Sequence, residues 1–470
     1  MDENKRRDLQ GLKEFRKVLN RFQDASEAVR ELSDFSERMS GEALKNSGSV
    51  DITIMPTLAA PSKEKAKEAA AALTDFFQGV KEALSNSSPE ESPDKVRELA
   101  ESMSDRLDAA STEDFDASKY IVETMTVYRR KNRRNVLRSS LLTSAVGDFE
   151  VLFSSLVGMY FQLRPQALSS KEPQFSWEDI QKFNSLEDLR AFHADRQVEQ
   201  LMWKGFDDWM EWLEKKLKIK FADISLDADA VTEVFQRRHV IVHNGAKVSR
   251  QYLNKVPKPE KGLKVGQDLE VTREYLAAAL DQLYVLGILM ASAVADRLIR
   301  DDEVRSVMQN QLASVVEGAM RSGRWKTVAR LCEIYTQTFD SEARKNSMRV
   351  NLWVARKEES GVEAIRSEVS SWDVSSLREE FELAKWTILD EFEEAHRLVC
   401  ELAHRDVLSE SEYLEDPLYA HLRDWVRETG QSSPFAERPK SDVSEITELV
   451  TEELKESGAA SIEDEVDPEH

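Results

Sequence analysis

The stretch VTEVFQRRHVIVHNG, residues Val231 to Gly245, is the most informative part of this 470-residue chain. Its apolar residues fall at positions 231, 234, 235, 241 and 242, a 3–4 spacing that predicts one buried helix face. Asn244-Gly245 predicts the end of the helix, because glycine adopts the left-handed backbone of a C-cap without steric cost. We therefore expect a helix with one buried stripe that stops at Gly245.

Arg238 lies on that predicted stripe, three residues after Phe235 and three before Ile241. A permanently charged guanidinium in a core stripe is costly unless an anion or a polar group meets it there. His243 falls in the last turn, where the negative end of the helix dipole favours an imidazolium, and Asn244 follows it. The combination predicts a site that handles a phosphate group.

Composition and targeting signals indicate an all-α protein of the cytoplasm. Hydrophobic residues make up 41% of the chain, with 16 glycines and 12 prolines, which favours long helices over a β-rich fold. The length allows two or three domains. Two cysteines, Cys332 and Cys400, are too few for a disulfide framework and suit a reducing compartment. No apolar segment follows the first residues, MDENKRR, so we expect no signal peptide.

Two strongly apolar segments, near 141–163 and 275–295, are interpreted as core helices and not as membrane spans. They contain Asp148, Glu150 and Asp281, and carboxylates inside a span are costly. Glu150 has two interpretations: it pairs with Arg238 or another cation, or it points outward at the edge of the apolar stripe.

Three tryptophans in the next helical segment, Trp203, Trp209 and Trp212, are expected in the core or at an interface.

The net charge of −23 opposes nonspecific binding to nucleic acid, but the charge is unevenly distributed. Residues 436–470 contain 12 acidic and 3 basic residues. In contrast, RRKNRR at positions 129–134 is a dense basic cluster. The arginines of this cluster are Arg129, Arg130, Arg133 and Arg134. They either form a solvated helix face, or they contact the phosphate backbone of RNA and guide it towards the site.

The segment RRHVIVHNG, residues 237–245, carries the pattern R-x4-H from Arg238 to His243 and resembles the HEPN superfamily. Those proteins are all-α domains, often metal-independent ribonucleases. The Arg-Arg-His and His-Asn-Gly flanks are similar to one prokaryotic branch, and the resemblance covers about residues 135–299. It implies a homodimer in which two such helices form one cleft, and a role as a toxin or an antiphage-defence effector.

The resemblance, together with the residue types, gives an expected mechanism with RNA as substrate and no cofactor. His243 acts as general acid or base on the ribose 2′-OH and the leaving oxygen. Arg238 binds the scissile phosphate, and Asn244 orients the histidine or the phosphate. Arg237 and His239 are further substrate-binding candidates. At 100° per residue, Arg238 and His243 lie about 140° apart around one helix, so two helices must meet to present both groups to one phosphate.

Two metal-site interpretations are weaker. The spacing His239-x3-His243 matches a zinc helix, but a metalloprotease helix would carry glutamate at position 240, which is valine. His396, Cys400 and His404 share one helical stripe, and a metal site there would need a fourth ligand. We therefore predict no bound metal.

The expected organisation has four parts. Residues 1–118 form an N-terminal helical region of unknown role, with a stripe over 4–40 that packs on its own domain or forms a coiled coil. Residues 119–302 form the HEPN-like domain. Residues 303–430 form a tetratricopeptide-like array that can dock a protein partner. This prediction is based on three segments of similar sequence, which start at Gly323, Gly361 and Glu391. Residues 431–470 form an acidic, disordered tail.

A competing function stays open. Many HEPN domains bind nucleotides or partner subunits without catalysis, and an acidic chain with a helical array would suit a scaffold of that kind. The two functions differ in whether the protein cleaves RNA and whether cleavage requires His243.

Overall fold

The computed structural model describes residues 2–46, 92–111, 116–168, 180–224, 227–260 and 262–435, with the short pieces 71–72, 75–76 and 78–79. Most of the predicted acidic tail lies outside these residues. The chain divides into two compact units, Met1–Met308 and Gln309–His470. The ranges 1–118 and 119–302 therefore both fall within the first unit.

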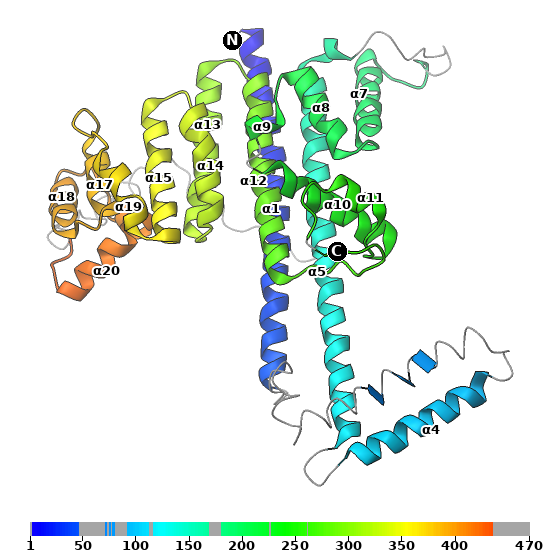
Figure 1. The fold of residues 1–470 in the computed structure, drawn as a ribbon. Coiled ribbons are helices and arrows are strands. Elements are labelled where there is room, and N and C mark those ends of the chain that lie inside the picture. The colour runs from blue at the N-terminus through cyan, green and yellow to red at the C-terminus, as the bar shows by residue number, and fades with distance from the viewer. Residues whose placement is uncertain are drawn as a thin grey trace, which may run out of the picture. The chain divides into compact units, whose positions relative to one another are not determined.

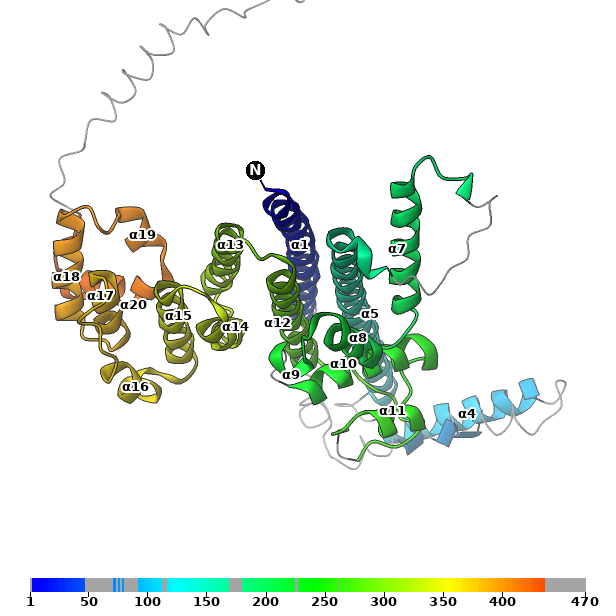
Figure 2. The same ribbon diagram turned by 90° about the horizontal axis from the view of Figure 1, so that it is seen from above.

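The described residues confirm an all-α fold. They form helices and no β-strand, and one isolated antiparallel bridge joins Lys247 to Asp268. Three long helices, α1 (Glu3–Asn46), α5 (Ala117–Leu163) and α12 (Arg273–Leu298), pack against one another in the first unit (Figure 1). Viewed from above, roughly along the helix axes, the three helices lie next to one another (Figure 2). Of the stripe on α1, the middle part from Leu12 to Phe22 is buried, whereas Leu9, Leu32 and Phe35 are exposed.

The three long helices meet at a glycine. A Cβ atom on Gly287 of α12 would lie 2.4 Å from the ring of Phe22 on α1. That ring stacks on Tyr284 with centroids 6.1 Å apart and meets the edge of Phe149 on α5 at 6.5 Å. Gly287 is therefore needed for the close approach of α1 and α12.

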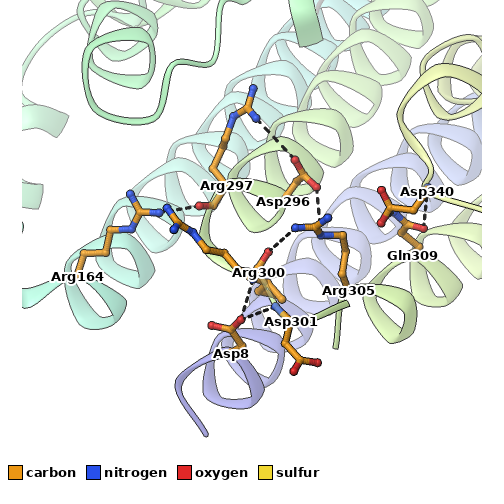
Figure 3. Close-up of polar contacts among 10 residues, drawn as sticks. Asp8, Arg164, Asp296, Arg297, Arg300, Asp301, Arg305, Gln309 and Asp340 are labelled. Carbon is orange, nitrogen blue, oxygen red and sulfur yellow. Dashed lines mark hydrogen bonds and ion pairs between the residues drawn. The ribbon is translucent and has the colours of Figure 1, made fainter. Parts of the chain in front are cut away.

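One end of this bundle is tied together by polar contacts around Asp8, which is 2% exposed (Figure 3). Its Oδ2 accepts hydrogen bonds from the backbone N–H groups of Arg300 and Asp301, at 2.7 and 2.8 Å. Arg164, just after α5, donates from Nη2 to the carbonyl of Arg297 at 2.7 Å. The start of α1 and the end of α5 thus both hold the turn that leads into α13 (Asp302–Arg321).

Shorter helices surround the bundle: α4 (Ser92–Ala110), η1 (Pro165–Ala167), α7 (Leu186–Met202), α8 (Phe206–Leu217), α9 (Phe221–Ile224), α10 (Ala228–Asn244) and α11 (Arg250–Lys255). Of these, α4, α7 and α10 pack against α5. Trp209 is 3% exposed, which confirms a core position, whereas Trp203 is 85% exposed at the end of α7, so an interface position for it stays a prediction. A solvent-exposed indole at that turn packs on no core.

In the second unit, helices α14 (Trp325–Thr338) and α15 (Glu342–Ser360) form one pair, and α17 (Glu379–Ile388) and α18 (Phe392–His404) form another. The segments at Gly323 and Glu391 lead into α14 and α18 as expected. Gly361 instead precedes η2 (Val362–Ala364) and the five-residue α16 (Arg366–Ser370), so no long helix starts there. The remaining elements are α19 (Glu410–Glu415), η3 (Pro417–Tyr419) and α20 (Ala420–Thr429).

Two helical segments, Arg134–Leu163 and Arg273–Leu298, are long and apolar enough to cross a membrane. Half of the apolar window of the first and 67% of the second are buried inside the protein. Core helices of soluble proteins have the same composition, so this is weak evidence for a membrane span. The interpretation of both as core helices stays a prediction.

Candidate active site

Helix α10 ends at the glycine that the sequence predicts. Asp227 is its N-cap and accepts a hydrogen bond from the backbone N–H of Ala230 at 3.0 Å. Gly245 is its C-cap, with the left-handed φ of 59°. The chain then turns into a hairpin over residues 246–271, in which the Leu269 N–H donates to the Ala246 carbonyl at 2.7 Å. The hairpin fixes the end of α10, where the candidate residues lie.

The buried face of α10 differs from the predicted stripe. Its buried residues are Val231, Val234, Arg237 and Val240, while Val242 is 47% exposed and Ile241 is half-buried. The prediction of a core position for Arg238 is therefore wrong, since 28% of its side chain is exposed. The physical reason is that α11, the hairpin and α12 cover a second face of α10.

Arg237 is the arginine in the core, and its partners lie within the protein. Its Nε donates to Oε1 of Glu233 at 2.6 Å, and its Nη1 donates to the carbonyl of Glu270 at 2.6 Å. The guanidinium also lies over the ring of Tyr275, 3.9 Å from the centroid. Because these contacts neutralise and hold it, we assign Arg237 to packing, in place of the expected substrate contact.

Two tyrosines complete this buried cluster, and sequence reasoning missed both. Tyr252 and Tyr275 donate from their hydroxyls to the two carboxylate oxygens of Glu233, at 2.6 and 2.5 Å. Burial, and then the Glu233 carboxylate, raise the pKa of both phenols, so both remain donors at neutral pH. The i, i+4 spacing of Glu233 and Arg237 was the available signal for this cluster.

Arg238 reaches across to α5. Its Nη2 lies 3.3 Å from Oε2 of Glu150, and 28% and 30% of the two side chains remain exposed. This confirms the first of the two interpretations of Glu150. The Nε of Arg238 has no hydrogen-bond partner among the residues that the structure describes. That atom is buried, so a further anion would meet the exposed part of the guanidinium and not its Nε.

The three polar residues at the end of α10 are accessible. His243 and Asn244 are exposed, and His239 is half-buried. The rings of His239 and His243 lie 4.7 Å apart between centroids, tilted by 47°. Burial lowers the pKa of His239, and the neighbouring His243, Lys255 and Arg238 lower it further. His239 is therefore a neutral imidazole at pH 7, with a lone pair that can accept a proton.

The basic cluster is described in part. Residues Arg129, Arg130 and Arg133 belong to α5, but their side chains lie outside the described part of the chain. Arg134 is half-buried and has a partner in the protein. The proposed path for RNA along these arginines stays a prediction.

The described side chains include no group of three or more His, Cys, Asp or Glu residues placed to hold a metal ion. The neighbouring rings of His239 and His243 thus have no described third ligand. In the second unit, the Sγ of Cys400 lies 3.7 Å from Nε2 of His396, again as a pair.

Comparisons of the chain with protein-family models, curated proteins and solved structures gave no match. The functional argument therefore depends on the residues of α5 and α10.

Proposed function

We propose that this protein is a metal-independent endoribonuclease of the HEPN type. The observation that supports it is the pairing of a partly exposed Arg238 with Glu150, on the same helix as two histidines whose rings lie 4.7 Å apart. An arginine held in this way is oriented but still has N–H groups for a phosphate. The imidazoles of the half-buried His239 and the exposed His243 supply groups for proton transfer.

The proposed reaction is an internal transfer of the phosphate. One histidine, His243, takes the proton from a ribose 2′-OH, and the 2′ oxygen forms a bond to phosphorus. The bond from phosphorus to the 5′ oxygen breaks, and that oxygen receives a proton from an imidazolium. Arg238 stabilises the charge that grows on the phosphoryl oxygens. The products are a 2′,3′-cyclic phosphate and a 5′-hydroxyl.

We further propose that two chains complete the site. Arg238 and His243 are five residues apart on α10, which separates them by about 140° around the helix axis. Two α10 helices related by a two-fold axis can bring Arg238 of one chain to the phosphate beside the 2′-OH that His243 of the other chain deprotonates. The side chains of Val242 on α10 and Val151 on α5, 47% and 38% exposed, supply apolar surface beside these residues for such a contact.

The paired helices of the second unit support the proposal of a tetratricopeptide-like docking array for a protein partner. A role as a toxin or antiphage effector in the cytoplasm follows from the HEPN resemblance and belongs to the same proposal. The competing function is a non-catalytic HEPN scaffold. The carboxylate of Glu150 beside Arg238 favours that alternative, because it already neutralises the cation.

Cleavage of a mixed-sequence RNA in the presence of a chelator distinguishes the two functions. The wild type should cleave it, and His243→Ala should lose at least a hundredfold in rate. A control variant, His404→Ala, removes an exposed histidine of the second unit and should cleave like the wild type. Equal activity of the wild type and His243→Ala would eliminate the proposed site, and RNA binding without cleavage would favour the scaffold.

A further inference from the structure

The hairpin over residues 246–271, which includes α11, is positively charged in a chain whose net charge is −23. It contains six basic and three acidic residues. The basic residues are Lys247, Arg250, Lys255, Lys258, Lys261 and Lys264. Because the chain as a whole repels polyanions, this local excess of positive charge marks the segment as a place where one can bind.

Three of these cations have no counter-ion among the residues that the structure describes. The side chains of Arg250, Lys255 and Lys264 are exposed and make no described ion pair or hydrogen bond. Two other lysines of the segment each pair with an aspartate, at 2.8 and 2.7 Å, and Lys261 lies outside the described residues. A solvated cation without a counter-ion can bind an anion at little cost, because no existing ion pair has to break.

The packing of α11 holds its basic residues next to the end of α10 (Figure 1). Tyr252 and Val256 are buried in one apolar cluster with Val240 of α10. Arg250 and Lys255, on the same short helix, remain exposed. One face of α11 thus attaches it to α10, and its other face presents cations to solvent beside the proposed site.

Lys255 lies close to the histidines of the proposed site. Burial lowers the pKa of the His239 imidazole, and the neighbouring His243, then Lys255 and Arg238, lower it further. Lys255 of α11 and Arg238 of α10 therefore both act on the same ring. A strand of nucleic acid carries one negative charge per nucleotide, so a strand whose scissile phosphate lies at Arg238 has further phosphates for neighbouring cations such as Lys255.

We infer that Arg250, Lys255 and Lys264 form a surface that binds the phosphate backbone of single-stranded RNA beside the proposed site; this rests on the proposed ribonuclease function. Basic surfaces that follow the backbone are typical of proteins that bind single strands. Contacts of this kind position the strand and do not read its bases, so the surface strengthens binding of all RNA sequences alike.

The salt dependence of binding tests this surface. A fluorescent single-stranded RNA with 2′-O-methyl groups, which block attack by the 2′ oxygen, is titrated with the full-length protein at several salt concentrations. Lys255→Gln should weaken binding at least threefold and reduce the slope of log K against log salt concentration by about 0.7, the change for one phosphate contact on a single strand. The triple variant that adds Arg250→Gln and Lys264→Gln should reduce the slope by about 2. Lys17→Gln, which removes an exposed charge of α1, is the matched control and should change neither quantity.

Cleavage measurements separate failure of this inference from failure of the proposed function. A wild type that cleaves RNA, with every variant at wild-type affinity and slope, would overturn the surface and leave the ribonuclease intact. A wild type that cleaves no RNA, with the expected loss of binding in the variants, would overturn the ribonuclease and keep the surface. Absence of RNA binding by the wild type would overturn the surface in either case. Tighter binding of a DNA strand of the same sequence, or of polyglutamate, would overturn RNA as the ligand.

Discussion

Arg238 on α10 and Glu150 on α5 face each other with 3.3 Å between Nη2 and Oε2, and each side chain keeps close to a third of its surface exposed. An ion pair this accessible contributes about 0–1 kcal/mol to folding. Its main effect is to fix the direction of a guanidinium whose Nε has no described partner. The pair thus couples the geometry of the candidate site to the packing of α10 on α5.

The first prediction concerns Glu150→Gln. Loss of the carboxylate releases Arg238 from its orientation, so kcat for RNA cleavage should fall at least tenfold while the free energy of unfolding changes by less than about 1 kcal/mol. Steady-state kinetics and urea titration measure the two quantities. Glu211→Gln, which breaks an exposed pair with Lys215, is the control and should change neither. An unaltered kcat in Glu150→Gln would show that the pair has no part in positioning.

The second prediction concerns the composite site. Arg238→Ala and His243→Ala should each be inactive alone. When they are co-expressed, random pairing makes half of the dimers mixed, and each mixed dimer has one site with both residues, so about a quarter of wild-type activity should return. Each variant expressed by itself is the control. If co-expression restores nothing although mixed dimers are present, Arg238 and His243 do not act across two chains.

The third prediction concerns the protonation of His239. Burial and neighbouring positive charges lower its pKa from the ordinary 6.5, so NMR titration should give a midpoint below that of a free histidine. Because the unfolded chain takes up this proton more readily, protonation of His239 destabilises the fold as pH falls below about 6.5. His243→Ala removes one of the neighbours that lower this pKa and should raise the midpoint. A midpoint at or above 6.5 in the wild type would contradict the described surroundings of His239.

The fourth prediction concerns the contact of α1 with α12. Gly287→Ala places a Cβ atom 2.4 Å from the Phe22 ring and should destabilise the protein by at least about 2 kcal/mol. Gly147→Ala on α5 is the matched control, because nothing lies within 4 Å of its added Cβ. It should raise the stability by about 0.5–1 kcal/mol through helix propensity. Thermal unfolding compares them, and equal melting temperatures would refute the close approach.

Local signals in the sequence predicted the elements that carry the site. The predicted end of α10 at Gly245 is correct, because a glycine cap acts within a few residues. The all-α class followed from composition. The pairing of Glu150 with Arg238 was one of two alternatives, since the sequence placed each residue on a helix without showing how the helices face each other.

The buried face of α10 could not be predicted correctly from the sequence. A stripe with 3–4 spacing identifies one core face, but α10 is covered on two sides, by α5 and by the segment from α11 to α12. The packing of the segment from α11 to α12 on α10 buries Arg237 and leaves Arg238 partly exposed. The cluster of Glu233 with two tyrosines forms between residues 19 and 42 positions apart, a separation at which no local pattern gives information.

The chemical ends of cleaved RNA test the central claim most directly. RNA incubated with the wild-type protein and a chelator should yield fragments with 2′,3′-cyclic phosphate and 5′-hydroxyl ends, as measured by mass spectrometry, and Arg238→Ala and His243→Ala should yield none. Fragments with 5′-phosphate and 3′-hydroxyl ends, or fragments that form equally with both variants, would contradict catalysis by Arg238 and His243.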